Sequence, residues 1–301
     1  MFETRTDLAL EAHEVALKNK KSALDGVIFR EEERQGYKLT RVEIISENGE
    51  RETGKPMGTY LTLDAGRIWD RGIDELKAVS QALGESIREL TKKCDSLLVV
   101  GLGNTTVTAD ALGPEALSHL IVTRHLKSAS PRLFGDMGFF DISAIAPGVL
   151  SQTGIETMEI VKSVVQKLKP SLVIAIDALA SRDMSRLGTV IQISDTGIAP
   201  GSGVGNHRPA LNEDSLGVPV ISMGIPTVVD ALTLTANVVE MCGVSVDSFV
   251  ENAKVEECKN MFVTPKDSDK IISYMSKAIG YAINMAFHTE LSFEEMISIS
   301  S

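Results

Sequence analysis

The sequence predicts an α/β protein with a mostly parallel sheet, helices on both faces of that sheet, and a small antiparallel subregion near the N-terminus. Short apolar runs at 96–101 (SLLVVG) and 171–176 (SLVIAI) are typical of strands that are buried on both faces of a parallel sheet. Between residues 95 and 241, such runs alternate with helical patterns, which predicts crossover connections and an α/β core.

The N-terminal part begins with apolar residues at helical spacing over 8–19, which predicts a short leading helix. Two apolar-alternating stretches, 26–33 and 38–45, flank the turn pair Gln35-Gly36 and predict a hairpin. A third strand is expected at 59–65, so the antiparallel subregion should span 20–66. Apolar residues at steps of three and four then predict one long helix from Trp69 to Cys94.

In the core, helices are expected at 114–126, 154–169 and 226–241, with Pro114 and Pro226 in the first turn of their helices. Further strands are expected at 142–147, 188–194 and 218–224. The chain should end with a strand and a helix within 261–288. No repeat or linker is visible, so we expect a single elaborated domain.

Composition excludes several classes of protein. The net charge of −11 argues against nucleic acid as a direct partner. No apolar run reaches the roughly 18 residues of a membrane span, and the charged N-terminus lacks a signal core, so we expect a cytoplasmic protein without membrane contact. Cys94, Cys242 and Cys258 lie far apart, which predicts a reducing compartment and cysteines that only pack.

Familiar catalytic and cofactor motifs are incomplete. The GLGN turn at 101–104 follows a strand, but Thr106 replaces the third glycine of a dinucleotide-binding loop and no acidic residue follows the next strand, so no cofactor is expected. Neither GxSxG nor HExxH occurs, and His119 and His125 are six residues apart, which does not place both imidazoles on one helix face. The glycine cluster at 201–206 is typical of a flexible loop that covers a substrate.

Asp195 lies in SDTG, the short signature of pepsin-like aspartic proteases. Those enzymes are all-β and bring two such loops together, whereas this chain has one within an alternating α/β pattern. We therefore interpret Asp195 as an ordinary turn residue.

Two other carboxylates are the best candidates for chemistry. Asp110 and Asp177 each follow a predicted strand, and ligands of open α/β sheets bind beyond the carboxyl ends of the strands. If the two side chains converge, one can stay protonated as an acid while the other activates water. The same oxygens could instead hold a divalent cation. Helix capping, or for Asp177 a pairing with Arg182, is the simpler structural alternative.

Several blocks of the sequence closely resemble the germination proteases of spore-forming Firmicutes, and they run in order over nearly the whole chain. They are RTDLALEA (5–12), VVGLGNTTVTADALGP (99–114), TRHL (123–126), APGVLSQTGIET (146–157), IAIDALASR (174–182), QISDTGIAPGSGVGN (192–206), GIPTVVDA (224–231) and MFVTPKDSD (261–269).

This resemblance implies an endopeptidase that initiates degradation of the small acid-soluble spore proteins during germination, in the forespore and spore core. It implies a zymogen cut between Asp7 and Leu8, with a propeptide of residues 1–7 and a peptidase domain of residues 8–301. It also implies that Asp110 and Asp177 are the essential aspartates, and that the protein forms a homotetramer.

The family's fold is similar to that of the hydrogenase maturation proteases, in which the equivalent acidic positions bind a metal. We favour a metal-free acid pair, and a metal-dependent peptidase that uses Asp110 and Asp177 as ligands is the alternative. A non-catalytic protein that binds a peptide through the 195–214 loop is a third possibility.

Overall fold

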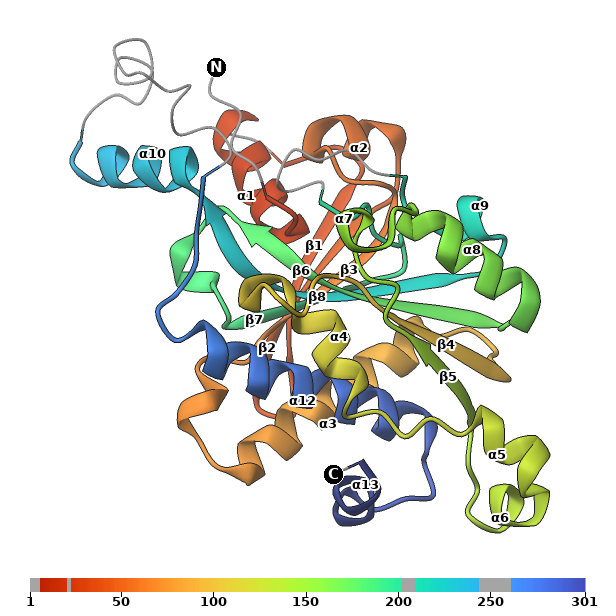
Figure 1. Cartoon of the computed structure of the whole chain (residues 1–301). Helices are drawn as coiled ribbons and strands as arrows, with labels where there is room; N and C mark the ends of the chain where they lie inside the picture. The colour runs from red at the N-terminus through yellow and green to blue at the C-terminus, as the bar shows by residue number, and fades with distance from the viewer. Residues whose placement is uncertain (1–5, 21–22, 202–208, 244–260, 301) are drawn as a thin grey trace.

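A single nine-stranded sheet runs through the computed structural model, which describes residues 6–20, 23–201, 209–243 and 261–300 (Figure 1). The strand order is β1-β2-β3-β7-β8-β6-β4-β5, and β9 pairs with β8. The strands are β1 Val27–Arg34, β2 Tyr37–Ile44, β3 Gly58–Asp64, β4 Ser96–Gly101, β5 Asp141–Ile145, β6 Leu172–Ser181, β7 Val190–Ser194, β8 Val220–Asp230 and β9 Phe262–Val263.

The parallel core predicted from the sequence is confirmed. Strands β5, β4, β6 and β8 are parallel neighbours, and β6 and β8 contribute nearly continuous apolar runs because both of their faces are covered. The predicted N-terminal antiparallel strands β1, β2 and β3 continue the same sheet through β7, which is antiparallel to both β3 and β8. The change from parallel to antiparallel pairing therefore occurs at β7.

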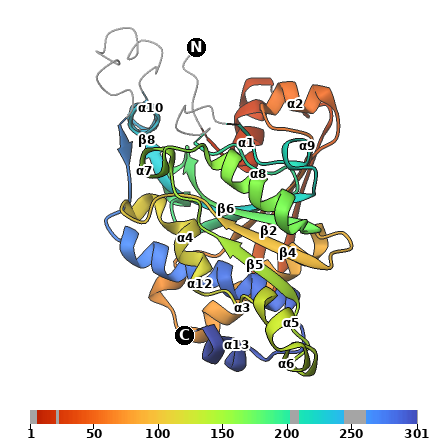
Figure 2. The ribbon, with the colours of Figure 1, turned by 45° about the vertical axis from the view of Figure 1, so that its right-hand side comes forward.

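Helices cover both faces of this sheet, as expected (Figures 1 and 2). On one face α3, α4 and α12 pack together over the largest apolar cluster, and on the other face α8 and α9 cover the parallel strands while α1 covers β2 and β3. In the described ranges the helices are α1 Ala9–Lys20, α2 Glu47–Thr53, α3 Ile73–Leu90, α4 Leu112–Leu117, α5 Arg124–Ala129, α6 Pro131–Asp136, α7 Leu150–Thr153, α8 Thr157–Leu168, α9 Glu213–Leu216, α10 Ala231–Met241, α12 Ser268–Phe287 and α13 Phe293–Ser300. The 3-10 turns η1 Ile68–Asp70, η2 Thr108–Asp110 and η3 Met184–Arg186 lie between them.

The helix predicted over 114–126 is wrong: the chain forms the short helix α4 and then leaves the helical path. Tertiary hydrogen bonds replace helical ones here, because the Asn284 side chain of α12 bonds both the carbonyl of His119 and the amide of Ile121. Thr123 then bonds the backbone of Ile142 in β5, which holds the chain against the sheet edge before α5 begins.

The helix predicted to begin at Pro226 is also wrong at its start, because β8 continues through Pro226 to Asp230. The β6–β8 register shifts between Leu179 and Ala180, so Pro226 lies at an irregularity of the ladder, where a missing N–H donor is tolerated. Helix α10 begins only at Ala231. Its N-cap is Asp230, whose carboxylate accepts from the amides of Leu232 and Thr233 at 3.0 Å.

Helix α2 was not predicted. It is bounded by Ser46, whose side chain accepts from the Gly49 amide, and by Gly54, which takes the left-handed conformation with φ of 67°. None of the helices in the described ranges is long and apolar enough to cross a membrane.

Candidate active site

Asp177 lies within β6, one residue beyond the point where the neighbouring strand β4 ends. Strand β4 ends at Gly101, opposite Ile176, and the Leu102 amide bonds the Ile176 carbonyl at 2.8 Å. The sequence predicted that β6 also ends there, but it continues to Ser181 beside β8. Asp177 is 7% exposed, and its carboxylate accepts a hydrogen bond from the Ala178 amide at 2.9 Å.

Asp110 closes the loop that follows β4. The Asn104 amide bonds the Asp110 carbonyl at 2.9 Å, and the Asp110 amide bonds the Val107 carbonyl at 2.8 Å. Gly103 faces this closure with φ of 117°, and a Cβ on it would lie 2.0 Å from the Asp110 carbonyl oxygen, so only glycine fits. Gly103, the second glycine of GLGN, therefore holds Asp110 in place instead of a phosphate.

The first turn of α4 is held against the end of β4 by a second close approach. A Cβ on Gly113 would lie 2.3 Å from the Leu102 carbonyl oxygen and 2.6 Å from the Ile176 carbonyl oxygen. This backbone contact fixes the chain three residues after Asp110 against β4 and β6. Packing of backbone on backbone thus sets the position of Asp110 relative to Asp177.

Both carboxylates line one cavity of about 470 Å³, which is within the range typical of ligand-binding clefts. Its walls come from the β4 loop, the end of β6, the C-terminal half of β8 and the segment around β9. The lining includes Gly103, Asp110, Asp177, Ala178, Thr227 and Phe262. The structure thus brings the two residues predicted from the sequence to the same cleft.

The N-terminal segment reaches this cleft as well, because Asp7 lines the same cavity. The Asp7 amide donates to the Ala180 carbonyl at 2.9 Å, and the Asp7 carboxylate accepts from the Ala180 amide at 2.8 Å. The next residue, Leu8, is completely buried against Leu179 and Val190. Residues 7 and 8 are therefore bound to the end of β6.

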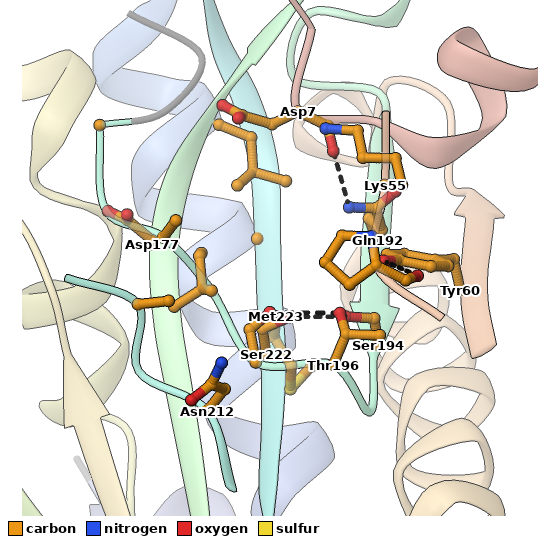
Figure 3. A pocket seen from close by; sticks show the side chains of 18 of the residues that line it. Asp7, Lys55, Tyr60, Asp177, Gln192, Ser194, Thr196, Asn212, Ser222 and Met223 are labelled. Atoms are coloured by element: carbon orange, nitrogen blue, oxygen red, sulfur yellow. Dashed lines mark hydrogen bonds between the residues drawn. The ribbon is translucent and has the colours of Figure 1, made fainter. Parts of the chain in front are cut away.

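Two polar side chains that the sequence reasoning missed hold the same segment, and Figure 3 shows them beside Asp7, across the pocket from Asp177. Gln192 of β7 donates to the Asp7 carbonyl at 3.2 Å and accepts from the Ala9 amide at 2.7 Å. The Lys55 ammonium donates to the Thr6 carbonyl at 2.9 Å. Burial lowers the pKa of Lys55, and the nearby carboxylates of Asp7 and Glu11 oppose that shift.

These residues line a second cavity of about 240 Å³, which adjoins the first, since Asp7 and Asp177–Leu179 line both. Gln192 could have been suspected from the sequence. An amide within the apolar run of β7 is 7% exposed and needs a partner, whereas nothing around Lys55 indicates its role.

Glu11 fastens α1 next to this segment. Its carboxylate is almost fully buried and accepts from the Ser181 hydroxyl and from the amides of Arg182 and Asp183 at 2.7–3.0 Å. The Arg186 guanidinium lies 3.3 Å away and balances the charge. A buried carboxylate with this many partners ties the first turn of α1 to the end of β6.

The other residues considered from the sequence lie elsewhere. Asp195 accepts from the Thr59 amide at 2.8 Å and joins the ends of β3 and β7, but it lines neither cavity. His119 packs on Tyr281, and Arg182 pairs with Glu240. Cys94 and Cys242 are free thiols away from both cavities. His207, Cys258 and most of the glycine cluster at 201–206 lie outside the described residues.

The described residues supply few ligands for a metal ion. Within this part of the chain, no three or more His, Cys, Asp or Glu side chains are grouped so that they could hold one. Asp7, Asp110 and Asp177 line one cavity but do not form such a group, whereas a catalytic zinc in proteins takes three protein ligands. The donor set in these ranges does not fit such a site.

The cleft that Asp110 and Asp177 line lies beyond the ends of parallel strands of an α/β sheet, which is where such folds bind their ligands. The family model for germination protease matches residues 3–246, and the chain belongs to this family of peptidases.

The chain is 45% identical to the germination protease of Caldanaerobacter subterraneus subsp. tengcongensis, over 97% of this chain and 96% of that one. It is 41% identical to the germination protease of Clostridium perfringens (strain ATCC 13124), over 98% of each chain. Among solved structures, the NiFe hydrogenase maturation protease HycI from Thermococcus kodakarensis KOD1 matches with a TM-score of 0.37 and 16% identity, covering 66% of this chain and 99% of that one.

Replacing Gln192 by Leu should release the N-terminal segment. The Asp7 carbonyl and the Ala9 amide would lose their shared partner, and an unmet buried polar group costs about 1–3 kcal/mol. We expect hydrogen exchange at the Ala9 amide to accelerate roughly ten- to hundredfold, measured by mass spectrometry or NMR.

Gln81→Leu, on the exposed side of α3, makes the same chemical change away from the segment and serves as the control. Equal exchange at Ala9 in Gln192→Leu and in the unmodified protein would show that Gln192 does not hold the segment.

Proposed function

We propose that this peptidase is an endopeptidase that initiates degradation of small acid-soluble spore proteins during germination. Membership in the germination protease family supports the role in spores, and the cleft that Asp110 and Asp177 share supports the chemistry. That shared cleft is the single observation on which the mechanism rests.

In the proposed mechanism, one of the two carboxyl groups holds a proton and the other is ionised, because like charges that share a confined site disfavour double ionisation. The ionised carboxylate takes a proton from water, whose oxygen forms a bond to the peptide carbonyl carbon. The protonated carboxyl donates its proton to the carbonyl oxygen. When the C–N bond breaks, a proton passes to the leaving amine, so one water is consumed for each bond cleaved.

Substituting either aspartate by Asn keeps the shape of the side chain and removes its acid–base function. We expect Asp110→Asn and Asp177→Asn each to lower kcat by about 10²- to 10⁴-fold, with a smaller effect on KM. The measurement is steady-state cleavage of a purified small acid-soluble spore protein by the folded variants.

Asp195→Asn is the matched control, because Asp195 is an acidic residue that follows β7 and lines neither cavity. We expect it to retain activity within about threefold, which is less than 1 kcal/mol. Full activity in either of the other two variants refutes the assignment, and binding without cleavage by the unmodified mature protein favours a non-catalytic role.

Metal removal separates the acid pair from a metal-dependent peptidase. Because no three ligand side chains in the described ranges are grouped to hold a metal ion, we expect exhaustive dialysis against a chelator to leave kcat unchanged. Metal content measured on the same sample supplies the control. Loss of activity that zinc or another divalent ion restores would favour the metal-dependent alternative.

We further propose that the protein is a zymogen with a propeptide of residues 1–7 and a single peptidase domain of residues 8–301. Asp7 lines the same cavity as Asp110 and Asp177, while the Asp7 carbonyl is bound by Gln192 and Leu8 is buried. This arrangement supports a cut between Asp7 and Leu8 that requires the segment to shift first.

N-terminal sequencing of the mature protein should therefore give Leu8 as the first residue. The uncut form should cleave a small acid-soluble spore protein much more slowly than the cut form does. A fully active protein that retains Met1 would contradict the zymogen proposal. Assembly as a homotetramer and a location in the forespore and spore core complete the proposal, and both derive from the family resemblance.

A further inference from the structure

Beyond Ile176, strand β6 has no neighbouring strand among the described residues on the side that faces the candidate active site. The backbone of Ile176 faces β4 and accepts from Leu102, and because strand residues alternate, Ala178 and Ala180 face the same way. Strand β4 ends opposite Ile176, and β8 lies on the other side of β6. Among the residues that the structure describes, therefore, the edge of β6 from Ala178 to Ala180 faces the cavity and not a strand.

The exposure of the β6 residues also identifies Ala178 as the accessible part of this strand. Every residue of β6 is buried except Ala178, which is partly exposed and lines both cavities. The Ala178 amide donates to the Asp177 carboxylate at 2.9 Å, so the exposed edge lies directly beside that side chain. The loop that carries Gly103 and Asp110 lines the same cavity. An extended peptide laid along this edge would therefore run past both carboxylates.

The chain itself already places a piece of peptide on this edge. The Asp7 amide donates to the Ala180 carbonyl, as the amide of an added strand would, and the Asp7 carboxylate accepts from the Ala180 amide. Pairing with the backbone at this edge is thus compatible with the surrounding side chains. The segment covers Ala180 and leaves Ala178 open to the cavity.

We propose that the substrate binds as an extended strand added to the edge of β6 at Ala178 and Ala180, with the bond to be cleaved beside Asp177. This inference rests on the proposed peptidase function. Backbone hydrogen bonds to β6 would give affinity for any extended peptide, and side-chain pockets would give selectivity. To reach Ala180, a substrate must displace Asp7.

Strand addition predicts an alternating pattern along the substrate, because only every second residue of an added strand turns its N–H toward β6. The probe is a fluorescent peptide that copies residues 3–14 of this chain. In a series of variants, each replaces one backbone amide by an ester, which removes one N–H donor with little change of shape.

Binding is measured by anisotropy to the full-length Asp110→Asn protein, so that cleavage does not intervene and the edge of β6 is intact. We expect two ester positions, separated by one residue, to weaken binding about tenfold, and the position between them to change it less than threefold. A flat profile, or losses at consecutive positions, overturns strand addition.

A second measurement tests whether the peptide and Asp7 share the edge. In the same background, Asp7→Ala removes the carboxylate from the Ala180 amide, and we expect the peptide to bind about tenfold more tightly. Asp25→Ala, an exposed carboxylate bonded to Asn48, is the control and should leave binding unchanged. Equal affinity in the Asp7 and Asp25 variants overturns the proposal.

The two proposals fail in distinguishable ways. If cleavage survives in Asp110→Asn or Asp177→Asn, the proposed chemistry fails whatever the binding profile is. If cleavage depends on both aspartates and the ester series is flat, the chemistry stands and only strand addition is lost.

Discussion

The early end of β4 is the constraint on which the rest of the site depends. Glycines at 101 and 113 let the start of α4 press onto the end of β4, so no further strand residue fits beside β6 beyond Ile176. Strand β6 nevertheless continues to Ser181, because β8 supports its other edge. The difference in length between the two strands opens the cleft and turns Asp177 from a strand-end residue into a residue of the cleft wall.

Backbone groups exposed in such a cleft must find partners, since an unmet amide or carbonyl in a poorly hydrated place is costly. Asp7, in the segment before α1, bonds both the amide and the carbonyl of Ala180. Gln192 and Lys55 in turn donate to the backbone carbonyls of this segment. Glu11 adds a separate attachment within α1 itself, through the amides that follow β6. The helix therefore keeps most of its attachment without residues 1–7, apart from the contact of Thr6 with Glu11.

Much of this arrangement follows from sequence pattern, and some of it does not. The apolar runs of β4 and β6 identify a parallel core, and the position of Asp177 after SLVIAI indicates a strand end near a ligand site. Pro114 does lie in the first turn of α4, but the predicted end of that helix at 126 is wrong because Asn284 bonds the chain at His119 and Ile121. The predicted helix start at Pro226 is wrong because proline marks helix starts only on average, and the irregularity between β6 and β8 accepts Pro226 within a strand. Gln192 and Lys55 bind residues far away in sequence, and local periodicity carries no information about such pairs.

Covalent attachment gives the segment around Asp7 a thermodynamic advantage over any partner from solution. A ligand joined to its own receptor by a short tether competes at an effective concentration on the order of millimolar. A free polypeptide at micromolar levels would meet a competitor in roughly thousandfold excess at Ala180, even with identical intrinsic affinity. On the zymogen proposal, latency then needs mass action alone, with no distortion of the catalytic groups, and a single cut in the tether ends it.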